Sequence, residues 1–211
     1  KAALIDEVDQ QLSGPAYRLT TGKRIALNLQ KLAHQADIVL DLHTGPISSQ
    51  HLYCPDYAKA SANYFNIPHV LIIPNDFAGA MDEASFCPWW QLTEALAQQG
   101  REFNVQVEAF TVELGSQEKI DLTAALDDAN SILSYLNHKQ VFVDAPYQPK
   151  VMKRYGCDLN DYLAYYAPMG GMVEYIAPLG GHIKAGEPIA RVLRMERYLA
   201  EQPLQTLTLD C

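Results

Sequence analysis

A histidine and a glutamate each follow a predicted strand of this 211-residue chain. His43 comes directly after the apolar run at residues 38–42, and Glu113 follows the alternating run at residues 105–112. Ligands of open α/β sheets bind outside the carboxyl ends of the strands, and parallel strands present these ends along one edge. The two side chains are therefore expected in one cleft, where a histidine and a carboxylate suit metal-assisted hydrolysis or general acid–base catalysis.

A second carboxylate lies just before the histidine. Asp41 points to the same side of the predicted strand as His43, because successive side chains of a strand alternate between its faces. A carboxylate in this place is suited to orient the imidazole of a metal ligand. Taken singly, each residue also has a simpler interpretation: such a histidine is usually a solvated loop residue, and such a glutamate is often a charge at a helix N-terminus.

The elements that must position these residues alternate between helices and strands. The helical spacing of apolar residues predicts helices near residues 1–12, 21–35, 56–66, 89–99 and 119–137. Runs rich in β-branched residues predict strands at residues 38–42, 69–73 and 105–112. Such alternation is typical of an α/β fold with a mostly parallel sheet flanked by helices.

From about residue 139 the helical pattern stops. Short β-type runs separated by proline and glycine follow, at residues 141–143, 172–176 and 189–193. We therefore predict two domains: a catalytic α/β domain at residues 1–138 and a small β domain at residues 139–211.

The composition disfavours several classes of function. The 25 acidic and 16 basic side chains give a formal net charge of −9, and no basic run exceeds Lys23-Arg24, so the footprint of nucleic-acid binding is missing. No apolar run approaches the roughly 18 residues of a membrane span, so we expect no membrane partner. Scattered cysteines without a C-x-x-C pair predict the ordinary thiols of a reducing, cytoplasmic compartment. They are Cys54, Cys87, Cys157 and Cys211.

The segments around His43 and Glu113 resemble those of a known enzyme family. Residues 41–45 read D-L-H-T-G and residues 111–115 read T-V-E-L-G. In this order they are similar to the D-L-H-T and T-x-E-x-G segments of the succinylglutamate desuccinylase/aspartoacylase family, which has a zinc carboxypeptidase-like fold. The resemblance implies that His43 is a zinc ligand and that Glu113 is the catalytic base.

Glycine-rich segments in the second predicted domain extend the resemblance. Residues 167–173 and 179–188 are similar to the biotinyl/lipoyl-like barrel that members of this family often carry. Carrier domains of this type hold a modified lysine at a hairpin tip, but residues 192–197 contain no lysine, and Lys184 stands in a turn that normally stays unmodified. A carrier function is therefore disfavoured. We expect the small domain to cover the active-site mouth or to make the contacts of a homo-oligomer.

Two parts of the family pattern are missing. The family's other zinc ligands belong to an upstream H-x-x-E segment, which this chain lacks; the nearest imitation, residues 34–37, lies on the predicted helix before the His43 strand. The family's Asn-Arg substrate pair is also missing, and Tyr17-Arg18 stands roughly in its place. Because a catalytic zinc needs about three protein ligands, either an N-terminal segment is missing or the protein is a metal-free relative. The intact His43 and Glu113 favour the first explanation.

The resemblance implies a zinc-dependent amidohydrolase acting on carbon–nitrogen bonds other than peptide bonds. Its substrate would be an N-acyl amino acid or a similar small acylated amine. Zinc would lower the pKa of a bound water to about 7, and Glu113 would move a proton from this water to the leaving amine. Arg101 is the candidate for binding a substrate carboxylate, although a solvated helix-end charge is the other interpretation. The alternatives are a zinc carboxypeptidase acting on peptides and a catalytically inactive binding relative.

Overall fold

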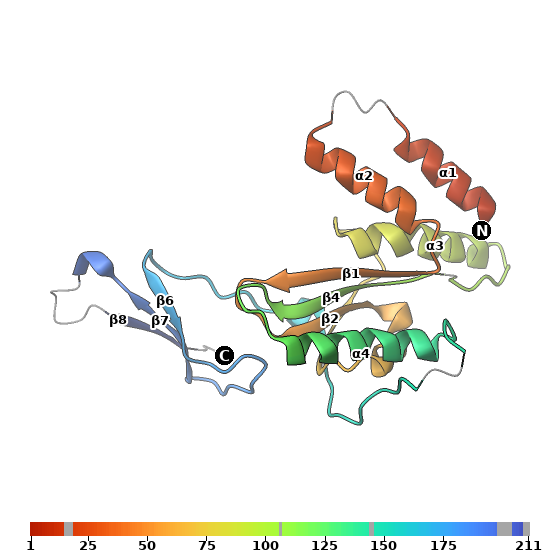
Figure 1. Ribbon diagram of the computed structural model, residues 1–211. Helices are drawn as coiled ribbons and strands as arrows, with labels where there is room; N and C mark the ends of the chain where they lie inside the picture. Colours follow the sequence, from red (N-terminus) through yellow and green to blue (C-terminus); the bar gives the residue numbers. More distant parts are fainter. Residues whose placement is uncertain (15–18, 106, 144–145, 198–203, 209–211) are drawn as a thin grey trace. The chain divides into compact units, whose positions relative to one another are not determined.

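The computed structural model contains one five-stranded sheet in the first part of the chain (Figure 1). β2 runs antiparallel to β4, and the other three neighbouring pairs are parallel. The prediction of an α/β fold with a mostly parallel sheet flanked by helices is thus confirmed. In sheet order the strands are β1 (Ile38–Gly45), β4 (Glu108–Ser116), β2 (Gln50–Pro55), β3 (His69–Ile73) and β5 (Tyr155–Asp158).

The structure describes residues 1–14, 19–105, 107–143, 146–197 and 204–208. Contacts divide the chain into two units, Lys1–Asn160 and Asp161–Cys211. The sequence-based boundary at residues 138–139 lies before β5, which pairs with β3 in the sheet of the first unit. Tyr17, Arg18 and Cys211 lie outside the described residues.

Helices cover both faces of the sheet. α3 contacts β1 and β4, and α2 contacts both α3 and α1. Figure 1 shows α4 on the opposite side of the sheet from α3. α4 begins after Asp121, whose carboxylate accepts hydrogen bonds from the N–H groups of Thr123 and Ala124. The α-helices of the described residues are α1 (Ala2–Leu12), α2 (Thr21–Ala33), α3 (Met81–Gln98) and α4 (Leu122–His138).

The core has two layers because the side chains of β4 alternate between the faces of the sheet. Phe110 is fully buried on the α4 side, where its ring lies 5.3 Å from that of Phe65 and 5.4 Å from that of Tyr135. Ala109 faces the other way and packs with Phe86 of α3. The same alternation turns the next residues of β4 on the α3 side, Thr111 and Glu113, towards one pocket.

A half-buried ion pair ties the amino end of β4 to the end of α4. The carboxylate of Glu108 accepts hydrogen bonds from the hydroxyls of Ser61 and Tyr135, and it pairs with the ammonium of Lys139. Burial, reinforced by the charge of Glu108, raises the pKa of Tyr135, so its hydroxyl keeps the proton that it donates. This network fixes where β4 starts, and with it the position of Glu113 further along the strand.

Several elements differ from the sequence prediction. The predicted helix at residues 56–66 consists of two 3₁₀ helices, η2 (Asp56–Ala58) and η3 (Ser61–Tyr64). α3 begins at Met81 rather than near residue 89, and it continues through Pro88. β2 and β5 were not predicted, and His43 and Glu113 lie within β1 and β4 rather than after them.

The second unit contains an antiparallel sheet of three strands in the order β6-β7-β8. Its strands are short and largely exposed on one side, and Gly180 and Gly186 take positive φ angles of 68° and 79° that favour glycine. Closure of this sheet into a biotinyl/lipoyl-like barrel stays a prediction. The elements are β6 (Met172–Tyr175), β7 (Pro188–Leu193), β8 (Leu204–Thr208) and the 3₁₀ helix η5 (Met195–Arg197).

Two further expectations concern membranes and cysteines. None of the helices in the described ranges is both long enough and apolar enough to span a membrane. Cys54, Cys87 and Cys157 are free thiols, and burial raises the pKa of Cys54 and of Cys87 to about 12. These two buried thiols therefore stay protonated and pack as small apolar groups.

His34 should make the stability of the first unit depend on pH. It caps the C-terminus of α2, is 2 % exposed, and neither ring nitrogen has a hydrogen-bond partner among the described residues. Burial lowers its pKa from 6.5, so the unfolded chain binds the proton at a higher pH than the folded chain. The free energy of unfolding should therefore fall as the pH drops through about 6.5 and below.

Replacing His34 by leucine should reduce this loss of stability between pH 8 and pH 5, because the buried base is gone. Urea unfolding at both pH values measures the effect. His182→Leu, at an exposed position of the second unit, is the matched control and should leave the pH dependence unchanged. An equal loss of stability in His34→Leu and in the unmodified chain would show that another group is responsible.

Candidate active site

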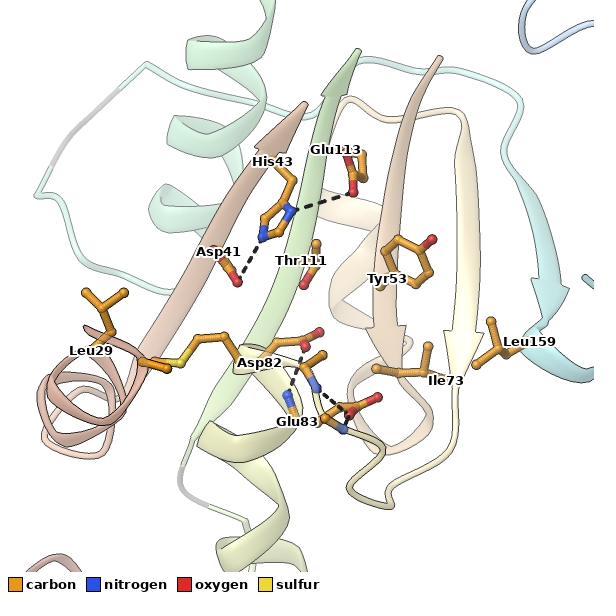
Figure 2. A pocket seen from close by; sticks show the side chains of 14 residues that line it. Leu29, Asp41, His43, Tyr53, Ile73, Asp82, Glu83, Thr111, Glu113 and Leu159 are labelled. Carbon is orange, nitrogen blue, oxygen red and sulfur yellow. Dashed lines mark hydrogen bonds and ion pairs between the residues drawn. The ribbon is translucent and has the colours of Figure 1, made fainter. Parts of the chain in front are cut away.

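The structure brings His43 and Glu113 together on neighbouring parallel strands. The two residues are register partners in the β1–β4 pair, as are Asp41 and Thr111 one step earlier on the same face. Figure 2 shows the imidazole of His43 between the carboxylates of Asp41 and Glu113. The Nδ1 atom of His43 lies 4.0 Å from Oε1 of Glu113, and its Nε2 atom lies 3.1 Å from Oδ2 of Asp41.

These distances assign different tasks to the two nitrogens of His43. At 3.1 Å, Nε2 forms an ion-pair contact with the carboxylate of Asp41, so Nδ1 is the nitrogen that faces Glu113. At 4.0 Å, Nδ1 and the carboxylate of Glu113 are too far apart for a hydrogen bond. A ligand atom can therefore lie between a nitrogen lone pair and a carboxylate, an arrangement suited to a metal-assisted proton transfer.

A pocket of about 560 Å³ opens beside this pair. The strands β1, β2, β3 and β4 form its base, and α2, the start of α3 and Leu159 form its walls. Its size lies within the range of roughly 300–1,000 Å³ that is usual for small-molecule sites. Apolar side chains such as Leu29 and Ile73 stand beside the polar groups of His43, Tyr53 and Glu113.

The N-terminus of α3 faces the pocket and carries two carboxylates. The Oε2 atom of Glu83 accepts the N–H groups of Ala78, Gly79 and Ala80 at 2.7, 2.8 and 3.0 Å. The Oδ1 atom of Asp82 accepts the N–H of Glu83 at 2.9 Å. The helix start is thus capped by its own side chains, which also offset the positive end of the helix dipole.

Asp82 is nearly inaccessible yet incompletely bonded. It is 1 % exposed, and its Oδ2 atom has no hydrogen-bond partner of normal geometry among the described residues. Burial raises the pKa of Asp82; the N–H of Glu83 and the hydroxyl of Thr111 oppose the shift, and the charges of Glu83 and Asp41 add to it. No lysine or arginine among the described pocket residues compensates its charge.

A serine clamp, formed by Ser48 and Ser116, joins the segments that follow His43 and Glu113. The N–H of Ser48 donates to the hydroxyl of Ser116 at 3.0 Å, and this hydroxyl donates to the carbonyl of Ser48 at 3.2 Å. Gly45 must stay small here, because a Cβ atom would lie 2.9 Å from that of Ser48. The register shift between His43 and Gly45 is held in place by this clamp.

The described residues do not complete a metal site by themselves. No group of three His, Cys, Asp or Glu side chains in the described part of the chain has the arrangement of a metal site. The Nδ1 atom of His43 fits one position of a zinc site, with Asp41 as its orienting partner. A catalytic zinc takes about three protein ligands, so the donor set found here is partial.

The other residues considered from the sequence lie elsewhere. Arg101 precedes β4 and lines a separate hollow formed by residues 97–104, and it is not among the residues that line the pocket of His43. His34 is buried at the end of α2, and Asp37 pairs with Lys1, so residues 34–37 do not supply a ligand loop. Sequence reasoning missed Asp82 and Glu83, although an acidic pair at a helix start is a usual capping signal.

Comparisons with known proteins identify an enzyme family. The family model of the succinylglutamate desuccinylase/aspartoacylase catalytic domain matches residues 6–139. The chain is similar to solved structures of succinylglutamate desuccinylase/aspartoacylase type from Shewanella frigidimarina, with 52 % identity and a TM-score of 0.89, and from Shewanella amazonensis, with 51 % and 0.90. A structure from Rhodobacter sphaeroides, with 17 % identity and a TM-score of 0.68, shares the fold.

These matches cover this chain more fully than they cover the relatives. Each Shewanella match covers 99 % of this chain, which spans 55 % of the first relative and 57 % of the second. The Rhodobacter match covers 97 % of this chain and 60 % of that protein. No curated protein gives a significant match.

The serine clamp should contribute measurably to stability. Ser116→Ala leaves the N–H of Ser48 without its partner, so the free energy of unfolding should fall by about 1 kcal/mol. Urea unfolding followed by circular dichroism measures this loss. Ser49→Ala removes a neighbouring hydroxyl that takes no part in the clamp and should have a smaller effect; equal losses would mean that the clamp is not the cause.

Proposed function

The chain belongs to the succinylglutamate desuccinylase/aspartoacylase family, and from this premise we propose that it forms part of a zinc-dependent hydrolase. The reaction is the hydrolysis of the amide bond of an N-acyl amino acid or a similar small acylated amine. The observation that supports it best is the placement of Nδ1 of His43 at 4.0 Å from the carboxylate of Glu113, beside a pocket of small-molecule size.

Glu113 is the general base of the proposal. Its side chain is 16 % exposed and lines the pocket from β4, an interior strand that pairs with β1 on one side and β2 on the other. A base must come within hydrogen-bond reach of the proton that it takes, and Glu113 lines the same pocket as His43, where the attacking water would bind. The same carboxylate then returns the proton to the nitrogen of the leaving amine.

His43 is the metal ligand of the proposal, through Nδ1. The contact of Nε2 with Asp41 places the ring with Nδ1 towards Glu113. Zinc bound there would supply the Lewis acidity that polarises the amide carbonyl. Further ligands are expected from parts of the protein beyond the described residues, which contain no group of three potential ligands.

Glu113→Gln in the complete protein should lower turnover by about 10²–10⁴-fold, because the amide keeps the shape of the side chain but accepts no proton. Zinc content should stay unchanged, because Glu113 is not proposed as a ligand. Hydrolysis of a panel of N-acyl amino acids and metal analysis of the purified protein measure the two effects. Activity on peptides alone would favour a carboxypeptidase instead.

His43→Ala should lower zinc content and activity together, because it removes a direct ligand. His69→Ala is the matched control: it changes a histidine at the amino end of β3, outside the pocket lining, and should keep both. Loss of zinc in Glu113→Gln together with its retention in His43→Ala would reverse the two roles. Full activity in both variants would mean that the site lies elsewhere.

A further inference from the structure

The pocket beside His43 and Glu113 is strongly acidic. Four carboxylates line it, from Asp41, Asp82, Glu83 and Glu113, and its described lining contains no lysine or arginine. A substrate group with a negative charge would therefore meet repulsion from several sides in a partly enclosed space. The excess of carboxylates favours a neutral or positively charged group.

The start of α3 does not offer free N–H groups to an anion either. Helix N-termini bind anions through their free N–H groups. At the start of α3, however, Glu83 accepts the N–H groups of Ala78, Gly79 and Ala80, and Asp82 accepts that of Glu83. A substrate carboxylate would have to displace Glu83 to reach these donors.

Asp82 supplies the observation that points to a ligand. Its side chain extends from the start of α3 towards Thr111 at the pocket wall (Figure 2). It is 1 % exposed, and Oδ2 accepts no hydrogen bond within the described residues. A buried carboxylate without a counter-ion loses the free energy of hydration of its charge. A cation on a bound ligand would offset this loss, because the attraction between opposite charges is strong where the dielectric constant is low.

Apolar groups stand around these carboxylates. Leu29, Met81, Ile73 and Leu159 line the same pocket. They offer contact to methylene groups, as a flexible chain with a charged end requires. A carboxylate behind apolar walls is therefore suited to a side chain that carries an ammonium or guanidinium group.

We propose that this pocket binds a positively charged group of the substrate, an ammonium or guanidinium at the end of a short apolar chain, with Asp82 as its counter-ion. The proposal rests on the proposed hydrolase function and specifies its substrate class. The substrates are N-acylated basic amino acids or diamines. Asp82 acts in substrate selection, whereas Glu113 and His43 act on the amide.

The test compares three substrates of similar size in the complete, zinc-loaded protein: Nα-acetyl-lysine, Nα-acetyl-norleucine and Nα-acetyl-glutamate. The value of kcat/KM for the lysine compound should exceed that for the norleucine compound by about tenfold or more, and the glutamate compound should be the poorest. Equal values for the three compounds, or a preference for the glutamate compound, would overturn the proposal. This comparison needs no variant, so it holds even if substitution of Asp82 prevents folding.

Asp82→Asn should remove the preference for lysine over norleucine, because the amide keeps the shape of the side chain but carries no negative charge. Asp76→Asn, the same change at an exposed position outside the lining, should keep the preference. An equal loss for all three substrates would show that Asp82 serves folding only. A loss of zinc in Asp82→Asn would show that its carboxylate serves the metal, and either result would refute the proposal.

A binding experiment separates this proposal from the proposed function. Calorimetry measures the binding of lysine, norleucine and glutamate to the Glu113→Gln protein, in which turnover is suppressed. Binding of lysine that is lost on adding Asp82→Asn, together with no hydrolysis of the three acyl compounds by the zinc-loaded protein with Glu113 intact, would support the cation pocket and refute the hydrolase. Hydrolysis with a preference for the glutamate compound would do the reverse.

Discussion

The parallel pairing of β1 with β4 is the constraint on which the site depends. Because it places His43 opposite Glu113 and Asp41 opposite Thr111, the polar groups of two distant segments share one face. A shift of one residue in either strand would turn its polar set into the layer that Phe110 occupies. The network of Glu108 at the amino end of β4 and the serine clamp beyond its carboxyl end both oppose such a shift.

Local patterns were sufficient to predict β1, β3 and β4 and the meeting of His43 with Glu113, because β-rich runs and polar residues at strand ends are visible in the sequence. The same patterns did not predict that α3 begins at Met81. Pro88 lies inside this helix, where proline usually marks a boundary, and the helix predicted from residue 89 did not include Asp82 and Glu83. Their burial comes from packing of α3 against β1 and β4, which no local pattern contains.

Arg101 shows that a charged residue close to Glu113 in the sequence need not lie close to it in the pocket. It precedes the same strand that carries Glu113, but it lies before the amino end, whereas Glu113 lies near the carboxyl end. The predicted anion-binding group is thus absent from the pocket lining, and carboxylates take its place. The charge of the pocket is a property of the tertiary structure, since residues from β1, α3 and β4 contribute to it.

The sheet order also gives the two strands that carry the site different numbers of neighbouring strands. Glu113 belongs to β4, which has β1 on one side and β2 on the other, whereas β1 has β4 as its one neighbour among the described residues. Within the described residues, the segment that carries Glu113 is therefore held by neighbouring strands on both sides, and the segment that carries His43 on one side.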